Sequence, residues 1–166
     1  LIVSLTELIA RLKMVNGQFQ TLTETLTKHL SMISEEERLK TFHCRWWPHK
    51  DPSPLGPKSM AEAGFYFCGD QEDDLVRCFS CMKELSGWDA DDDPWIEHRR
   101  KTNCHYLQLQ KVQNELTVEE FIRLKSLVFD TSLEQFTTEV LSLYDSYTKD
   151  KMLHLKKVYA TYANGK

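Results

Sequence analysis

Four residues in the middle of this 166-residue chain have the types and the spacing of a metal site. Cys78 and Cys81 form a C-x2-C pair, with sixteen residues between Cys81 and His98 and five between His98 and Cys104. Three thiolates and one imidazole in two clusters suit a tetrahedral Zn²⁺ ion, the first pair on a tight turn and the second placed by a helix. Because the protein fills all four positions, the pattern predicts one structural Zn²⁺ and no metal catalysis. The competing interpretation is three buried thiols and an unrelated histidine.

The other cysteines indicate no second chemistry. Cys44 and Cys68 are too few for a second zinc module such as a RING, and we interpret them as small buried residues. The zinc-deaminase order is absent, because the C-x2-C pair comes first and Arg100 stands at the glutamate position. A cysteine hydrolase using Cys44 with His43 or His49 is disfavoured, since sequence neighbours rarely form a dyad and no oxyanion motif is evident. We therefore predict that the chain is not an enzyme.

A strongly acidic segment surrounds the metal candidates. Residues 70–97 hold ten acidic side chains against Arg77 and Lys83, so we expect a cation to bind there. Trp88 beside the aspartates 91–93 offers a flat apolar wall next to carboxylates, which suits a small side chain with a free α-ammonium group. The alternative is a solvated acidic turn with a core tryptophan.

Composition limits the classes of protein that remain. The net charge of −4 argues against a protein that mainly coats nucleic acid, and no apolar run approaches the roughly 20 residues that cross a bilayer. Residues 1–15 lack the pattern of a secretory signal, so we predict an intracellular, reducing compartment, where five cysteines are ligands or buried thiols. The chain begins at Leu1 rather than Met, as a fragment would.

Two apolar stripes predict helices at the ends of the chain. Residues 5–33 follow a three-four rhythm that the turn dipeptide Asn16-Gly17 interrupts, and we favour two short antiparallel helices over one bent helix. Thr117 and Glu120 form a capping box that starts one long helix over residues 118–163, with a kink near Asp130. A projecting stripe needs a partner helix; the alternative partner is the segment 5–33.

Between these ends lies a compact region rich in Trp, Pro and Cys. Short helices are expected near residues 36–42 and 58–63, and short strands at residues 65–68 and 75–79 around an acidic turn.

Several short motifs around the metal candidates resemble the baculovirus IAP repeat, or BIR, domain. The motifs are Arg38-Leu39-Lys40-Thr41-Phe42, Trp47-Pro48, Met60-Ala61-Glu62-Ala63-Gly64-Phe65, Cys78-Phe79-x-Cys81, Gly87-Trp88, Asp91-Asp92-Asp93-Pro94-Trp95 and Glu97-His98. The single motif set, the absence of a RING, the Lys83-Glu84-Leu85 sequence and the Leu116-Thr117 helix start resemble survivin-like single-BIR proteins. One departure is the five-residue spacing between His98 and Cys104, where those proteins have six.

The resemblance implies an α+β fold and a peptide-binding groove. It implies a small zinc-binding BIR domain (35–109) with a short three-stranded sheet and short helices, then a long C-terminal helix (116–163). Here a helical N-terminal extension (1–34) precedes them. In BIR domains the counterparts of Leu85, Trp88 and Asp92 bind peptides that begin with alanine, and Glu97 is a second acid. Lys83 and Lys101 correspond to residues that hold the phosphate of a histone tail phosphorylated on threonine.

The resemblance also implies partners and a role. The long helix would join borealin-like and inner-centromere-protein-like helices, and through them an Aurora-type kinase. Its contact stripe is Phe121, Leu124, Val128, Phe136, Val140, Leu143 and Tyr147. A homodimer through Tyr106, Val118 and Phe121 is a further expectation.

The sequence thus predicts a non-enzymatic mitotic adaptor of the chromosomal passenger type. Its expected locations are the nucleus, the centromere, the spindle and the cytoplasm, and no membrane is involved. The alternative is an inhibitor of apoptosis that binds caspases or the alanine amino termini of pro-apoptotic proteins.

Overall fold

The computed structural model describes residues 5–44, 46–70, 73–100 and 103–163. These residues form two structural units, which we call the compact unit and the helical arm. The compact unit comprises residues 26–132, and the helical arm comprises the segments up to Thr25 and from Leu133 onward. Two long helices, α1 (Leu5–Ser31) and α6 (Val118–Ala163), each contribute to both units. No helix in the described residues is long and apolar enough to cross a membrane.

The compact unit contains a small antiparallel sheet surrounded by short helices. Its strands pair in the order β1-β2-β3, with Phe65 opposite Cys78 and Val76 opposite Leu85. The α+β fold with a three-stranded sheet is therefore confirmed. In chain order the elements are α2 (Glu35–Phe42), α3 (Pro57–Glu62), β1 (Phe65–Phe67), β2 (Val76–Cys78), β3 (Glu84–Leu85), α4 (Pro94–Arg99), α5 (His105–Leu109) and the 3₁₀ turn η1 (Gln113–Glu115).

A buried guanidinium lies in the core of the compact unit. The Arg38 side chain is 0% exposed and donates hydrogen bonds to the carbonyl oxygens of Ala61, Met32 and Ile33 at 2.9–3.0 Å. Its guanidinium carbon lies 4.3 Å from the centre of the Phe79 ring. A buried cation is costly unless hydrogen bonds compensate for its lost hydration, and these hydrogen bonds tie α2 to α3 and to the turn that follows α1.

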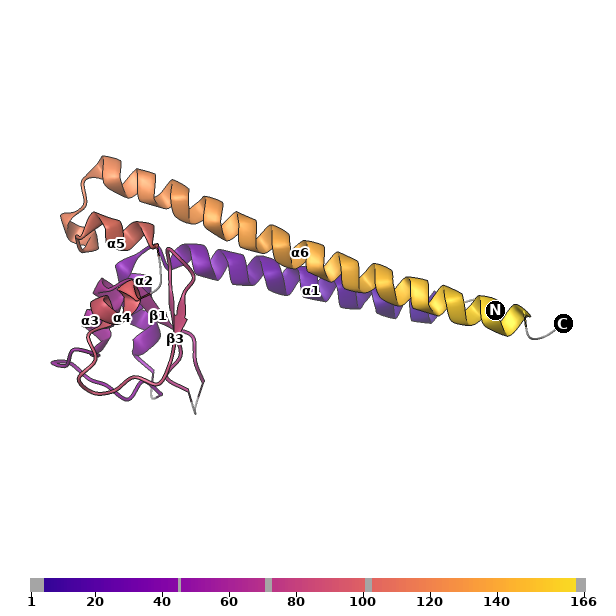
Figure 1. Cartoon of the computed structure of the whole chain (residues 1–166), viewed down its shortest axis with the longest axis horizontal. Coiled ribbons are helices and arrows are strands. Elements are labelled where there is room, and N and C mark those ends of the chain that lie inside the picture. Colours follow the sequence, from indigo (N-terminus) through magenta and orange to yellow (C-terminus); the bar gives the residue numbers. More distant parts are fainter. Residues whose placement is uncertain (1–4, 45, 71–72, 101–102, 164–166) are drawn as a thin grey trace. The chain divides into compact units, whose positions relative to one another are not determined.

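The N-terminal segment is one helix, so the predicted helical hairpin is wrong. α1 continues through Asn16 and Gly17 as far as Ser31. A glycine inside a helix costs only about 1 kcal/mol relative to alanine, which the neighbouring helical residues and packing within the arm offset. In the arm α1 runs antiparallel to α6, and the two helices share a groove (Figure 1). The groove is lined by Gly17, Gln18, Thr21, Leu22, Glu139, Ser142, Leu143 and Ser146. This shared groove confirms the alternative prediction that the long C-terminal helix pairs with the N-terminal segment.

The long C-terminal helix starts where the capping box predicts. The Thr117 amide donates to Glu120 Oε2 at 2.8 Å, and the Glu120 amide donates to Thr117 Oγ1 at 3.2 Å. The helix then runs without interruption for 46 residues, through Asp130. The helix is therefore not interrupted at Asp130, the position for which the sequence predicts a kink.

Candidate metal centre and peptide-binding surface

The four predicted metal ligands converge in the compact unit. The ligand atoms of Cys78, Cys81, His98 and Cys104 all lie within 4.8 Å of one another. The Cys78 and Cys104 sulfurs are 3.9 Å apart, and Cys81 Sγ is 3.5 Å from His98 Nε2. Zn²⁺ binds thiolates at about 2.3 Å and imidazole nitrogen at about 2.0 Å, so ligands at these separations can surround one ion.

The chain around each ligand orients it toward the cluster. Cys78 ends β2, and the turn after it contains Met82 with a positive φ of 61°. The Ser80 amide lies 3.2 Å from Cys78 Sγ, as a donor to a thiolate would. On the other side, His98 Nδ1 lies 2.9 Å from the Ala63 carbonyl oxygen, which leaves Nε2 for the metal. Such hydrogen-bond contacts to the ligand residues are typical of a structural zinc site.

Burial explains why the cluster needs a cation. Burial raises the pKa of the Cys78 thiol, with further contributions from its contacts with Cys104 and Cys81. Burial lowers the pKa of His98, but hydrogen bonds to Cys104 and Cys81 outweigh it and raise the pKa to about 9. Several thiolates in so small a buried space are stable only beside a positive charge, which Zn²⁺ supplies. The donor set therefore fits a structural zinc ion with all four coordination positions filled by the protein.

Helix α4 carries His98 and is held at both ends. At its start, the Asp93 side chain accepts hydrogen bonds from the amides of Trp95 and Ile96 at 2.8 and 3.1 Å. At its end, Lys83 Nζ donates to the carbonyl oxygens of Glu97, His98 and Arg100. The structure thus gives Lys83 a positioning role near the metal ligands. Lys101, the other predicted phosphate ligand, lies outside the described residues.

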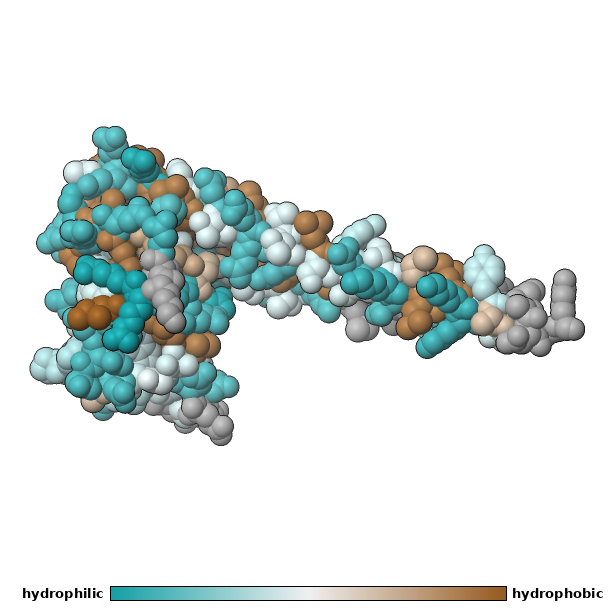
Figure 2. Space-filling view, in the orientation of Figure 1, coloured by the Kyte–Doolittle hydropathy of each residue, from teal (hydrophilic) through white to brown (hydrophobic). Residues whose placement is uncertain are grey.

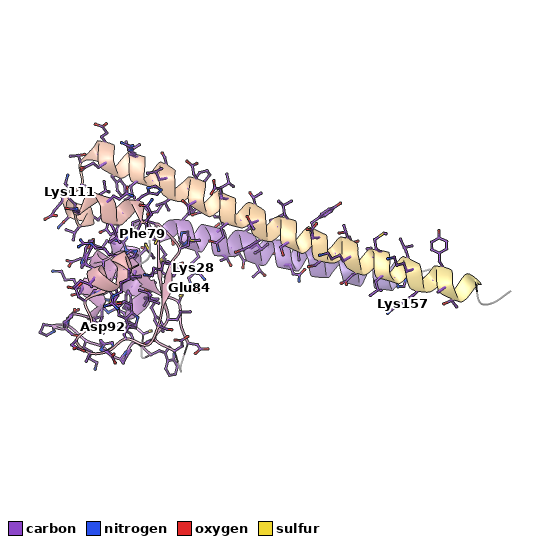
Figure 3. All side chains as sticks on the ribbon, in the orientation of Figure 1. Lys28, Phe79, Glu84, Asp92, Lys111 and Lys157 are labelled. Carbon is purple, nitrogen blue, oxygen red and sulfur yellow. The ribbon has the colours of Figure 1, made fainter. Side chains whose placement is uncertain are left out.

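The predicted peptide-binding residues lie on β3, on the following turn and on α4. Trp88 packs edge-on against Phe65, with ring centres 5.8 Å apart, and Phe65 also lies 4.5 Å from the His98 ring. Leu85, Trp88, Asp92 and Glu97 are all half-buried. Figure 3 shows Asp92 in the loop region of the compact unit. We call these four residues the candidate peptide surface; its ligand stays a prediction.

Sequence reasoning missed the residue that positions Trp88. Asp74 Oδ1 accepts from the Gly87 amide at 2.6 Å, and Asp74 Oδ2 accepts from the Trp88 amide at 2.8 Å. These contacts hold the turn at Gly87, whose φ is +74°. Asp74 is one acid among ten in the segment, so no local signal distinguishes it from its neighbours.

The two cations of the acidic segment are already engaged. Arg77 pairs with Glu84 on the adjacent strand, and Lys83 is bound to the end of α4. Glu97 forms an ion pair with Arg100 at 2.9 Å. Asp92 accepts the Asp89 amide at 2.9 Å and has no ion-pair partner among the described residues. The surface around Asp92 therefore keeps a net negative charge.

Several predicted partner-binding residues do not fit that role. Leu124 and Val128 are 3% and 1% exposed and belong to the core of the compact unit, so they offer no surface to a partner helix. Tyr106 is fully buried, and its hydroxyl donates to the Glu62 carbonyl oxygen at 2.7 Å, so it is not a dimer contact. The side chains of α5 and early α6 cover the core instead.

The other predicted contacts remain at least partly accessible. Val118 is 77% exposed, and Phe121 is half-buried. Phe136 and Val140 are half-buried, Tyr147 is 37% exposed, and Leu143 lines the groove that α6 shares with α1. Their partner role stays a prediction.

Comparison with known proteins assigns the family. The BIR family, described as Inhibitor of Apoptosis domain, matches residues 38–108. Baculoviral IAP repeat-containing protein 5.1-A of Xenopus laevis is 38% identical over 138 residues, which cover 82% of this chain and 82% of that protein. The chain belongs to the survivin-like BIR family. Proteins of this family are not enzymes, and the Cys₃His cluster is typical of their structural zinc. The prediction of one structural Zn²⁺ is therefore confirmed.

Other members and one solved BIR domain are also similar to this survivin-like chain. Baculoviral IAP repeat-containing protein 5 of Rattus norvegicus is 43% identical over 95 residues, covering 56% of this chain and 66% of the rat protein. This chain also matches the crystal structure of DIAP1 BIR1 bound to a Grim peptide, with 34% identity and a TM-score of 0.40. The match covers 55% of this chain and 90% of the DIAP1 chain.

Proposed function

We propose that this survivin-like protein is an adaptor that binds the free amino terminus of a peptide at the candidate peptide surface. The observation that carries the proposal is the electrostatic state of that surface. Arg77 and Lys83 are both engaged within the fold, and among the residues that the structure describes neither Asp92 nor the neighbouring Asp91 has an ion-pair partner. A peptide α-ammonium group is a cation of the right size to lie beside a half-buried indole and a carboxylate.

Each residue of the surface has a distinct role in this proposal. The Trp88 ring, positioned by Asp74, provides an apolar wall for a small first side chain. Asp92 accepts the ammonium group, and Leu85 borders the extended peptide from β3. Glu97 becomes a second acceptor when its ion pair with Arg100 opens. Opening this pair costs little, because a partly exposed ion pair is worth at most about 1 kcal/mol.

The biological ligand we propose is a histone amino-terminal tail phosphorylated on threonine. The protein would use it to place a mitotic kinase complex on chromatin, with borealin-like and inner-centromere-protein-like helices on α6. Membership of the survivin-like family supports this role. The predicted contact positions on α6 that stay at least partly accessible, outside the groove with α1, are Phe121, Phe136, Val140 and Tyr147.

The second candidate is capture of alanine amino termini from pro-apoptotic proteins, without a phosphate. The contacts of Lys83 favour it, because a lysine that donates to three carbonyl oxygens must leave them to bind a phosphate. Under this candidate the same Trp88 and Asp92 bind the peptide.

Calorimetric titration of the full chain tests the proposal with four peptides. The peptides begin with alanine and differ only in a free or acetylated amino terminus and in phosphorylated or plain threonine at the third residue. We expect acetylation to abolish binding, and Asp92→Asn to weaken it by roughly 10- to 150-fold, since a charge-assisted hydrogen bond is worth roughly 1.5–3 kcal/mol. Asp91→Asn is the matched control, because Asp91 is an exposed neighbour of the same charge.

The outcomes separate the candidates. Tight binding of the phosphorylated peptide alone supports the histone-tail role, and equal binding of both free peptides supports the apoptotic role. Binding that survives acetylation contradicts both.

A further inference from the structure

The groove that α1 shares with α6 in the arm contains one of the predicted partner contacts. Leu143 lines this groove and is half-buried. An α-helix turns by about 100° per residue, so Leu143 lies on the same side of α6 as three other predicted contacts, all within about 60° of one another. These contacts are Phe136, Val140 and Tyr147. A partner helix that covers this whole side of α6 would therefore meet α1 at Leu143.

The rest of the α6 surface in the arm is more open than this side. Leu141 and Tyr144, which point away from the side that carries Leu143, are 59% and 63% exposed, whereas Phe136 and Val140 are half-buried. Apolar residues interrupt the hydrophilic surface of the arm on the face in view in Figure 2. The difference in exposure indicates that α1 partly covers the side of α6 that the predicted partners would use.

The α1 side of the groove offers few apolar contacts. Among the described α1 residues that line it, Leu22 has the one large apolar side chain and is half-buried, whereas Gly17, Gln18 and Thr21 are exposed. The Thr21 and Thr25 hydroxyls donate to the carbonyl oxygens of Gly17 and Thr21, so they bind α1 itself. Of the described α1 residues, Leu22 therefore contributes most to the pairing in this groove.

The same part of α1 has a low intrinsic tendency to form a helix. Residues 17–25 include one glycine and three threonines, which are weak helix formers. Most helical stability in proteins comes from packing, so this part of α1 depends on α6 to stay helical. A helix with such a small apolar contact can be replaced by one with a larger apolar side.

We propose that α1 is an internal competitor for partner helices on α6. It covers the side that carries Leu143 while no partner is bound, and a partner helix that binds there replaces it. The apparent affinity for a partner is then reduced to the fraction of chains in which α1 has left the groove. The proposal rests on the proposed binding of partner helices to α6 and does not involve the candidate peptide surface.

A labelled synthetic peptide of residues 5–26 tests the competition without a partner protein. The peptide has the sequence of α1, so it enters the groove when the α1 of the chain leaves it. Fluorescence anisotropy with the zinc-loaded full chain measures its affinity. We expect Leu22→Ser in the chain to raise that affinity by roughly 3- to 10-fold, because the competing helix loses a half-buried leucine. Gly17→Ala in the chain should lower it by roughly 3- to 5-fold, because a better helix former competes more strongly.

Gln20→Ser is the matched control for Leu22→Ser. Leucine and glutamine have similar helix propensities, so the two changes weaken α1 as a helix to a similar degree. Gln20 is exposed and lies on nearly the opposite side of α1 from Leu22. Its side chain bonds Glu24 within α1, and loss of that bond should change the peptide affinity by about twofold at most. Equal affinities of the two serine variants would overturn the proposal, as would a peptide that binds neither of them.

Hydrogen exchange with the proposed borealin-like helix tests replacement by a partner. Its binding should slow amide exchange in α6 around Leu143 and speed exchange in α1, because α1 is released. Slower exchange in both helices would show that α1 stays beside the partner, which would overturn the proposal. Unchanged exchange in α6 would contradict the proposed partner role instead, and the peptide titration would then decide by itself whether α1 can be displaced.

Discussion

The same two helices bury their side chains in the compact unit and expose them in the arm. In α6, Leu124, Val128 and Ser132 are at most 3% exposed, whereas no described side chain from Leu133 to Thr161 is buried. In α1, His29 is buried, but none of the described side chains from Gly17 to Lys28 is. The helical backbone is thus continuous across both units, while the core belongs to only one of them. Helix formation depends on local residues, whereas burial depends on the surrounding fold. Each of these helices therefore keeps its backbone conformation beyond the point where its side chains stop being buried.

The contrast agrees with the proposed roles of the two units, peptide binding by the compact unit and helix binding by the arm. A zinc cluster, a buried guanidinium and a closed core make the compact unit complete by itself, so its surface can be rigid enough to select a peptide. The arm has a groove of mixed small, polar and leucine side chains between its helices and several exposed apolar side chains outside, in keeping with the proposed binding of other helices.

Loss of the metal should give the largest difference between the two units, because it should destabilise the compact unit and leave the arm largely helical. Removal of zinc by a chelator, or Cys104→Ser, should abolish the cooperative unfolding of the compact unit, because structural zinc contributes about 10–16 kcal/mol of apparent binding energy in small zinc domains. Helical circular dichroism from the arm should persist in part. Cys44→Ser is the control, since Cys44 is not part of the cluster. A melting curve unchanged by complete metal removal would show that the metal does not support the core.

The buried Arg38 should give the next largest effect. Arg38→Met keeps much of the volume but removes the guanidinium donor from three carbonyl oxygens, and we expect a loss of about 3–5 kcal/mol in the free energy of unfolding, since each buried acceptor left unsatisfied costs about 1–3 kcal/mol. Urea denaturation measures this loss. Lys58→Met, an exposed change on α3, should leave stability unchanged. Equal effects of the two substitutions would contradict the role of Arg38 in joining the helices.

The buried His29 should make the compact unit sensitive to acid. Its Nδ1 lies 3.0 Å from the Tyr66 hydroxyl, and burial, helped by the nearby charge of Arg77, lowers its pKa from 6.5 to about 4. The folded state then binds fewer protons than the unfolded state between these values. The stabilisation is complete above about pH 6.5 and declines as pH falls toward 4, by up to about 3 kcal/mol.

A comparison with His29→Gln isolates this effect from acid release of zinc. Denaturation at saturating zinc between pH 5 and 7.5 should give a steeper loss of stability for the histidine protein than for the variant. Parallel curves would show that His29 is not protonated on unfolding.

Two glycines should give small effects of opposite sign in the two units. Gly17 lies inside α1, and an added Cβ there meets nothing within 4 Å, so Gly17→Ala should stabilise the arm by about 1 kcal/mol through helix propensity. Gly64 has a φ of +91°, and an added Cβ would lie 2.9 Å from Tyr106 Cδ1, so Gly64→Ala should destabilise the compact unit by about 1–3 kcal/mol. Thermal melts of the two variants measure both signs. A destabilising Gly17→Ala would mean that the glycine is needed for close helix packing in the arm.

Residue type and spacing alone predicted the zinc centre and the long capped helix, and the resemblance of the short motifs to BIR domains implied the α+β class. The ligands Cys78 and Cys81 have few other uses at that spacing, and the capping box of Thr117 and Glu120 acts over three residues, so both signals are local. Only the tertiary structure decided that Leu124 and Val128 are core residues, that Lys83 holds the end of α4, and that Asp74 positions Trp88. It also decided that α1 continues through Gly17. These outcomes depend on which distant segment packs or donates a hydrogen bond, and no local pattern of charge or apolar spacing carries that information.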